Sequence, residues 1–254
     1  MAGWGYRLAF NHRRERAKLV HWPPYALAKW SQRWHGLCVL CHEPMTDNGN
    51  FTSMLCATCH SLMSWHLPPI KLQINQTDPQ KLQQSYQFHL YFATFYQYPM
   101  NRAMTRFKDS EHLPSLMLLI HAIEQLPKPI GAHADNTVII PIPTTKKRLA
   151  KRGFDPVMVL AKSLSYHWQL PLWQGLDRID DVHRQRGLSR QQRLNNVIDA
   201  FILNGTPPAR RVILFDDVAT TGATLQAAAS VIIRCVPKIS LLAVCVAHGV
   251  QNFS

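Results

Sequence analysis

Residues 212–224 read VILFDDVATTGAT, and this stretch decides the fold class. Its four leading apolar residues predict a buried strand, and the small and hydroxyl residues after the two carboxylates predict a loop. The apolar and small residues at 225–229 predict a helix directly after that loop. Such a junction surrounds an anion with backbone N–H groups and the positive end of the helix. The stretch therefore predicts an α/β fold with an anion site.

The polar groups of this stretch favour two kinds of ligand chemistry. Three threonine hydroxyls can donate to a phosphate, and Gly222 lets the backbone approach it closely. Two adjacent carboxylates suit a diol or a metal beside the phosphate. The carboxylates are Asp216 and Asp217. The expected phosphate-binding residues are Ala219, Thr220, Thr221, Gly222, Ala223 and Thr224. A phosphate beside a diol describes a ribose 5-phosphate.

The same stretch resembles the 13-residue signature of type I phosphoribosyltransferases, which bind phosphoribosyl pyrophosphate. The resemblance implies that the acidic pair holds the ribose 2- and 3-hydroxyls while the threonine loop cradles the 5-phosphate. A Walker B strand is an alternative, but its partner loop needs a Gly-Lys dipeptide, which the chain lacks. A simple helix cap is another, but it needs one acid or hydroxyl rather than two acids and three threonines.

Length and composition limit the class of protein. A chain of 254 residues can bury one core and a small module, and 46% hydrophobic with 17% charged residues is typical of globular rather than disordered chains. The net charge of +13 favours anionic partners: nucleotides, pyrophosphate or nucleic acid. No apolar run is long enough for a membrane span, and residues 1–35 are basic without the apolar core of a signal peptide. We therefore expect a cytoplasmic protein with a basic N-terminal extension.

Four cysteines have the spacing of a metal site. They are Cys38, Cys41, Cys56 and Cys59, in the pattern C-x2-C-x14-C-x2-C. Two tight pairs can supply four thiolates to one tetrahedral zinc ion. Disulfides are the alternative, but a C-x-x-C pair is a poor structural crosslink and no export signal is present. His35, His42 and His60 flank the cysteines and could each replace a ligand.

The patterns along the whole chain predict four segments. They are a basic extension (1–35), a zinc module (36–66), a linker (67–85) and a phosphoribosyltransferase-like domain (86–254). Within the last, the patterns predict strands at 86–93, 138–140 and 239–246, and helices at 101–125 (broken at Pro114) and 156–168. The alternating aromatics at 86–93 favour a sheet face against a core, with a base-stacking platform as the alternative.

A basic loop follows the strand at 138–140. Its cations include Lys146, Lys147, Arg148 and Arg152. Ligands of open α/β sheets bind beyond the carboxyl ends of the strands, so this loop would suit pyrophosphate. A solvated run of charge is the alternative.

The order of these motifs resembles the ComF family, also called GntX-like or competence-protein-F. The matching features after the cysteines are Ile140–Pro143, Lys151–Phe154, Arg184-Gln185 with Leu188, Arg193 with Asn196, Ala200-Phe201, and Asp216–Thr224. The resemblance implies a zinc module, a type I phosphoribosyltransferase domain, and a link to natural transformation and incoming DNA. Members of the family usually have Asn-Gln at the positions of Asp155-Pro156 in this chain. A family contact to the acceptor or to pyrophosphate is therefore not expected to be the same here.

We therefore expect a cytoplasmic protein that binds phosphoribosyl pyrophosphate with Mg²⁺, transfers its pentosyl group, and serves DNA uptake or utilisation. Asp216, Asp217 and Arg152 would be catalytic; Lys146, Lys147 and Arg148 would hold pyrophosphate, and residues 184–196 could close over the site. The alternative is a non-catalytic factor that binds single-stranded DNA and senses phosphoribosyl pyrophosphate. A salvage enzyme for purines or pyrimidines is weaker, because such enzymes need no zinc module.

Overall fold

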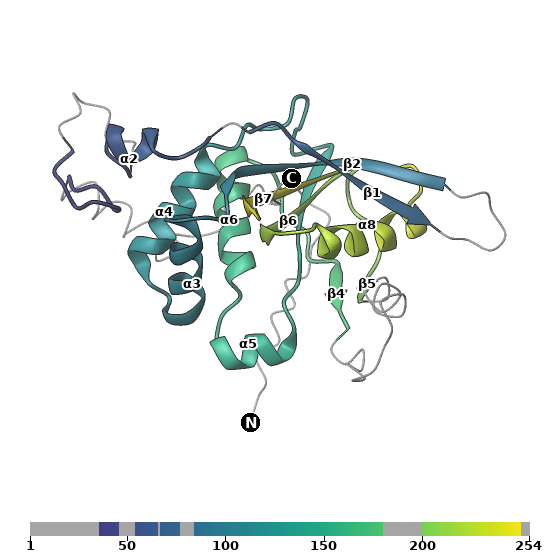
Figure 1. Cartoon of the computed structure of the whole chain (residues 1–254). Helices are drawn as coiled ribbons and strands as arrows, with labels where there is room; N and C mark the ends of the chain where they lie inside the picture. Colours follow the sequence, from purple (N-terminus) through teal and green to yellow (C-terminus); the bar gives the residue numbers. More distant parts are fainter. Residues whose placement is uncertain (1–35, 46–53, 66, 77–83, 180–199, 250–254) are drawn as a thin grey trace.

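The computed structural model describes residues 36–45, 54–65, 67–76, 84–179 and 200–249. A five-stranded sheet in the order β1-β2-β7-β6-β3 forms the centre (Figure 1). Its strands are β1 (Ile70–Gln76), β2 (Gln84–Phe95), β3 (Thr137–Pro141), β6 (Arg211–Ala219) and β7 (Ser240–His248). Strands β2, β7, β6 and β3 run parallel to one another, and β1 pairs antiparallel with β2 at one edge. The α/β fold with a largely parallel sheet is confirmed.

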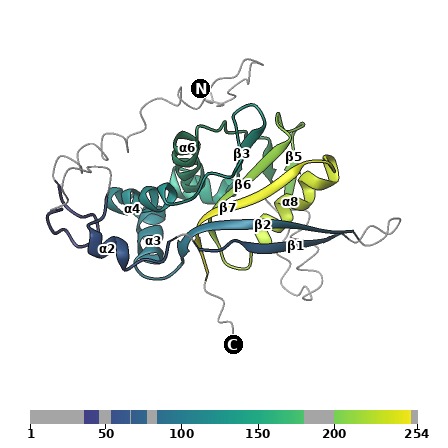
Figure 2. The same cartoon turned by 90° about the horizontal axis from the view of Figure 1, so that it is seen from above.

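Helices cover both faces of the sheet (Figure 2). One face carries α3 (Met100–Ser110), α4 (Leu113–Glu124) and α6 (Pro156–Trp168), and the other carries α8 (Ala223–Cys235). The remaining elements are α2 (Ala57–Ser61), α5 (Lys146–Arg152), β4 (Leu176–Arg178) and β5 (Phe201–Leu203). Strand β6 serves both cores, because side chains alternate along it: Ile213 and Phe215 pack with α3, α4 and α6, whereas Val212 and Leu214 pack with α8.

Several predicted elements agree with the structure. Strand β2 contains residues 86–93, and its Phe88 and Phe92 are buried, which supports the sheet face over the stacking platform. The helix expected at 101–125 is divided into α3 and α4 by Glu111, whose φ of 50° ends α3. Pro114 lies in the first turn of α4, where its missing N–H costs nothing.

Three local expectations were wrong. Part of the expected linker is edge strand β1, because Leu72 and Ile74 are buried while the polar Lys71 and Gln73 face solvent. The basic loop is the short helix α5, which begins after Thr145 caps the N–H of Arg148 at 3.2 Å. The strand expected at 212–215 continues to 219, since residues 216, 218 and 219 still pair with β7.

Two further expectations concern other parts of the chain. The basic extension (1–35) and the closing segment (184–196) lie outside the described residues. Among the helices that the structure describes, none combines the length and the apolar character that a membrane crossing requires.

Candidate functional site

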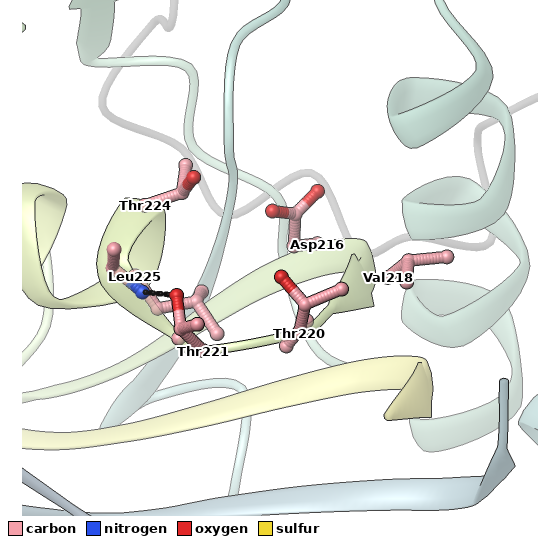
Figure 3. A pocket seen from close by; sticks show the side chains of 9 residues that line it. Asp216, Val218, Thr220, Thr221, Thr224 and Leu225 are labelled. Carbon is pink, nitrogen blue, oxygen red and sulfur yellow. Dashed lines mark hydrogen bonds between the residues drawn. The ribbon is translucent and has the colours of Figure 1, made fainter. Parts of the chain in front are cut away.

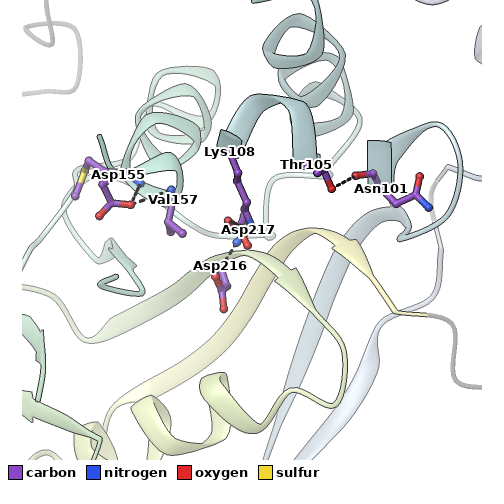
Figure 4. A network of polar contacts seen from close by, with 8 residues as sticks. Asn101, Thr105, Lys108, Asp155, Val157, Asp216 and Asp217 are labelled. Atoms are coloured by element: carbon purple, nitrogen blue, oxygen red, sulfur yellow. Dashed lines mark hydrogen bonds and ion pairs between the residues drawn. The ribbon is translucent and has the colours of Figure 1, made fainter. Parts of the chain in front are cut away.

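The acidic pair lies within strand β6, so its two carboxylates point to opposite faces of the sheet (Figure 4). Asp216 lines a hollow on the side of α8. Asp217 faces α3, where its Oδ2 lies 2.7 Å from the Nζ of Lys108. The structure therefore separates two residues that the sequence analysis had assigned to one diol.

The hollow beside Asp216 gathers the expected phosphate-binding residues (Figure 3). Its lining consists of Asp216, Val218, Ala219, Thr220, Thr221, Gly222, Ala223, Thr224 and Leu225. Gly222 precedes the first turn of α8 with a φ of 74°, and the N–H of Ala223 donates to Thr221 Oγ1 at 3.4 Å. The first N–H groups of a helix have no partners within the helix, so this lining can hold an anion.

Gly222 is constrained by its surroundings as well as by its backbone. A Cβ atom on this residue would lie 2.8 Å from Cδ2 of Leu72 on β1. The edge strand thus packs directly under the turn that shapes the hollow. The close backbone approach expected of Gly222 is therefore made to Leu72 of β1, a residue that no pattern in the sequence identifies.

Lys108 is a site residue that the sequence analysis missed. Its side chain is 21% exposed, and that of Asp217 is 9% exposed, so the ion pair is largely shielded from water. Lys108 occupies the last turn of α3, far from the acidic pair in the sequence, and no motif marks it. Only the packing of α3 against the sheet brings the two charges together.

The pKa of Asp216 is strongly shifted from its usual value. Burial and the charge of Asp217 raise its pKa to about 8, although the N–H of Asp217 and the charges of Lys108 and Arg178 act in the opposite direction. The N–H of Asp217 donates to Asp216 Oδ1 at 2.8 Å. The raised pKa favours the protonated form of Asp216, which can both donate to and accept from a hydroxyl group.

Asp155 explains the departure from the family pattern. Its Oδ1 accepts from the N–H groups of Val157 at 3.0 Å and Met158 at 3.2 Å, which caps α6, and Pro156 occupies the first helical position. Asp and Asn are both good caps, and Pro is favoured next to them, so Asp155-Pro156 preserves the helix start. Burial raises the pKa of Asp155, the charge of Asp217 adds to this, and that of Arg152 opposes it.

The expected pyrophosphate cations lie on α5. Lys146, Lys147 and Arg148 are exposed, and Arg152 is half-buried. None of them lines the hollow beside Asp216, nor a second hollow at the end of β3 that includes Asp155 and Asp177. Their role in holding pyrophosphate stays a prediction.

The four cysteines form a compact cluster. Within the described residues, the Sγ atoms of Cys38, Cys41, Cys56 and Cys59 all lie within 4.8 Å of one another, and every cysteine is a free thiol. The Sγ atoms of Cys41 and Cys56 are 3.7 Å apart. Four sulfur atoms around one tetrahedral zinc ion lie about 3.8 Å apart, whereas a disulfide requires about 2.05 Å. The cluster fits a structural zinc site and excludes disulfides among these cysteines in this structure.

Local hydrogen bonds favour the thiolate of Cys38, whereas the pKa values of Cys41 and Cys59 are raised. Cys56 precedes α2 and accepts from the N–H of Cys59 at 3.4 Å. Burial disfavours ionisation of Cys38, but backbone hydrogen bonds at Cys41, Cys56 and Leu40 outweigh it and lower the pKa of Cys38 to about 7. The thiolate is the form that binds metal.

His60, which the sequence offered as a replacement metal ligand, contacts another histidine instead. Its Nδ1 lies 3.0 Å from Nε2 of His121 on α4, and its ring stacks on Trp65 at 5.2 Å. The indole N–H of Trp65 donates to the carbonyl of His60 at 2.9 Å. His60 therefore links the cysteine cluster to the helical face of the sheet.

These features define the class of protein: an α/β protein with a hollow at the end of a central parallel strand, formed by a strand-to-helix turn that can hold an anion, and a separate cysteine cluster. No family model matches the sequence. Competence protein F of Haemophilus influenzae is 38% identical over 92 residues, covering 35% of this chain and 40% of that protein. DNA utilization protein YhgH of Escherichia coli O157:H7 is 29% identical over 146 residues, 49% of this chain and 64% of that protein.

Competence protein ComFC of Bacillus subtilis (strain 168) is 34% identical over 92 residues, or 36% of each chain. The matches thus span between 36% and 64% of the length of these curated relatives. Their names confirm the resemblance drawn from the motifs. Among solved structures, a xanthine-guanine-hypoxanthine phosphoribosyltransferase of Helicobacter pylori is similar with a TM-score of 0.30 and 15% identity, covering 65% of this chain and 90% of that one.

Proposed function

We propose that this protein binds phosphoribosyl pyrophosphate and transfers its phosphoribosyl group, in a process linked to DNA uptake or utilisation. One observation carries the proposal: Asp216 and the threonine loop share the lining of one hollow at the N-terminus of α8. A phosphate-binding turn beside a hydroxyl-binding acid is the pattern that a ribose 5-phosphate requires. The resemblance of residues 212–224 to the phosphoribosyltransferase signature supports the same ligand.

In this proposal the loop at 220–224 holds the 5-phosphate, and Asp216 hydrogen-bonds to a sugar hydroxyl. Asp217 lies outside the hollow and would act on the site from the α3 side of the sheet. The bond between C1 and pyrophosphate breaks, a bond from C1 to the acceptor forms, and the proton lost by the acceptor passes to the departing pyrophosphate. Arg152, with Lys146, Lys147 and Arg148, would neutralise the departing pyrophosphate when the donor is bound. Mg²⁺, bound with the donor, would share that charge.

The proposed partners follow from charge and from the relatives. The names of the relatives refer to competence and DNA utilization, and a net charge of +13 favours nucleic acid. We place single-stranded DNA and the DNA-uptake machinery among the partners. A cluster of free thiols that fits structural zinc supports a reducing compartment, the cytoplasm.

A non-catalytic sensor is the second candidate. It is favoured by the absence, among the described residues, of any Lys or Arg from the lining of the hollow. A sensor would bind the sugar phosphate there without having to stabilise departing pyrophosphate. The two candidates differ in one observable, the release of pyrophosphate.

Calorimetry with phosphoribosyl pyrophosphate and Mg²⁺ tests the site. We expect Asp216→Ala and Thr224→Val each to weaken binding, because each removes a hydrogen bond to the ligand, and a lost hydrogen bond costs about 0.5–3 kcal/mol depending on the charge of its partner. Asp109→Ala is the matched control, since Asp109 is exposed on α3 outside the hollow. Binding by both site variants as tight as that of the wild type would contradict the proposal. Pyrophosphate release on addition of nucleobases, nucleotides or single-stranded DNA would identify the enzyme, and binding without release would identify the sensor.

A further inference from the structure

We propose that Cys41 and Cys56 form an oxidation site, at which an oxidant of the peroxide class joins their sulfur atoms in a disulfide and so removes the metal from the cysteine cluster. The proposal goes beyond the proposed function, because it concerns a modification of the cluster and needs no sugar-phosphate ligand. It rests on the unequal surroundings of the four cysteines.

The cluster has an inner and an outer side. Cys38 is 0% exposed and Cys59 is 6% exposed, and both belong to the apolar cluster that continues into α3, α4 and α6. Cys56 is half-buried at the start of α2, which lies beside α4 (Figures 1 and 2). Cys41 is exposed, on a turn in which the N–H of His42 donates to the carbonyl of Cys38 at 3.0 Å. An oxidant dissolved in water therefore meets Cys41 first.

A second thiol lies within reach of Cys41. Its Sγ is 3.7 Å from that of Cys56, and a disulfide bond is about 2.05 Å long, so the two atoms must approach by about 1.7 Å. The N–H of Val39 donates to the carbonyl of Met54 at 3.0 Å, which holds the two cysteine-bearing segments side by side. An accessible thiol next to a resolving thiol is the arrangement that oxidises reversibly.

The reaction balances with peroxide as the oxidant. Metal binding keeps cysteines as thiolates, the form that attacks. The Cys41 sulfur attacks one peroxide oxygen, the O–O bond breaks, and a sulfenic acid and a hydroxide form. The Cys56 sulfur then attacks the Cys41 sulfur, the S–S bond forms, and the S–O bond breaks to release a second hydroxide. The two sulfur atoms lose two electrons to the peroxide, and two protons from solvent convert the hydroxides to water.

The disulfide would remove two of the four metal ligands. Cys38 and Cys59 alone do not supply the tetrahedral set that structural zinc needs. The sulfur of Cys56 also accepts from the N–H of Cys59 at 3.4 Å at the start of α2, and its movement toward Cys41 weakens this cap. Because a small module of this kind folds on its metal, oxidation should unfold it and uncover the side of α4 that it contacts.

The test uses the full-length, zinc-loaded protein and hydrogen peroxide. A chromogenic chelator follows zinc release, which should equal one ion for each disulfide formed. Remaining thiols are then alkylated and the chain is cleaved before Asp47, which lies between the two cysteine pairs. Tandem mass spectrometry should find Cys41 linked to Cys56. A dithiol reductant with added zinc should restore the metal content, because a disulfide is a reversible oxidation state.

Two substitutions by histidine separate the oxidation site from the metal site. Cys41→His and Cys59→His each keep four ligands, because zinc also binds three cysteines and one histidine. Only the first removes the proposed oxidation site. We expect Cys41→His to release zinc at least about tenfold more slowly than the wild type, and Cys59→His to release it within about threefold of the wild-type rate. Cys235→Ser is the matched control, because it removes an exposed thiol of α8 outside the cluster and should leave the rate unchanged.

A disulfide within either C-x-x-C pair, or zinc release from Cys41→His as fast as from the wild type, would overturn the proposal. If the histidine variants do not hold zinc, the wild type decides alone: zinc that is retained in peroxide, or lost without the link between Cys41 and Cys56, has the same consequence. None of these results bears on the proposed function, since binding of phosphoribosyl pyrophosphate is measured separately.

Discussion

The cysteine module and the sheet body are stabilised in different ways. We use "cysteine module" for residues 36–45 and 54–65, and "sheet body" for the described residues from 67 onward. The body buries apolar side chains on both faces of its sheet, and every residue of β3 is buried. The module has few buried hydrophobic residues, namely Cys38, Val39, Met54, Leu55, Cys59 and Met63. Two of these six are members of the sulfur cluster. We therefore expect the body to fold on its own core and the module to require a metal.

The two regions are nevertheless joined. The buried residues of the module belong to the same apolar cluster as those of α3, α4 and α6, and Figures 1 and 2 place α2 beside α4. The contact between His60 and His121, with Trp65 against both rings, adds a polar and aromatic link. The comparison thus predicts two unfolding events that are coupled through one interface.

Removal of the metal should have the largest effect. Structural zinc contributes on the order of 10 kcal/mol to the folding of small modules. We expect the purified protein to contain one zinc per chain, and Cys38→Ser or a chelator to release it and unfold the module while the body stays folded. Elemental analysis and calorimetric unfolding measure the two parts. Loss of the entire transition after zinc removal would show that the regions are one cooperative unit.

A cavity in the body should have the next largest effect. Ile213 lies in the central strand β6 and is fully buried, so Ile213→Ala should cost about 2–5 kcal/mol of unfolding free energy. Zinc content should not change. Ile202→Ala is the matched control, because Ile202 is 51% exposed and should lose far less. Equal losses from the two variants, measured by denaturant unfolding, would contradict the assigned core.

Asp216 should make the stability of the body depend on pH. Its folded pKa is about 8, and an unfolded aspartate titrates near 4, so the folded state retains the proton over that interval. Stability should therefore fall as pH rises from about 4 to about 8. Asp216→Asn removes this loss, so its stability relative to the wild type should rise steadily from pH 4 to pH 8, with the difference vanishing near pH 4.

The charges of Asp217, Lys108 and Arg178 act on the pKa of Asp216, and Asp216 acts on that of Cys245, so the comparison is made with these residues intact. Thermal unfolding across pH 4 to 8 measures the difference between the variant and the wild type. Asp109→Asn, at an exposed position on α3, should show no such widening. A constant difference at every pH would contradict a raised pKa.

The interface should give the smallest effect. Trp65→Phe keeps a ring against His60 and His121 but removes the indole N–H that donates to the carbonyl of His60. We expect a loss of about 0.5–1.5 kcal/mol, confined to the transition of the module. Calorimetry of the zinc-loaded protein resolves this. A larger loss of unfolding free energy in the body than in the module would contradict this prediction.

Much of the architecture could be predicted because it depends on local patterns. Buried runs such as 138–140 predict strands, and Pro156 after Asp155 marks the start of α6, whatever surrounds them. The cysteine pairs carry their own geometry, because each C-x-x-C turn places its two thiols close together. The prediction missed β1, where Ile70, Leu72 and Ile74 alternate with polar residues, because this short run lies within a polar segment; pairing with β2 completes the strand.

The sequence by itself determined the local elements of the candidate site: a strand with two acids, a threonine loop and the start of a helix. Tertiary structure decided how they are used. Strand β6 continues through Asp216 and Asp217 because β7 pairs with it, so the two acids face opposite sides. Lys108 reaches Asp217 only because α3 packs on one of those sides. Charges distant in the sequence meet through packing, and no local pattern encodes such a meeting.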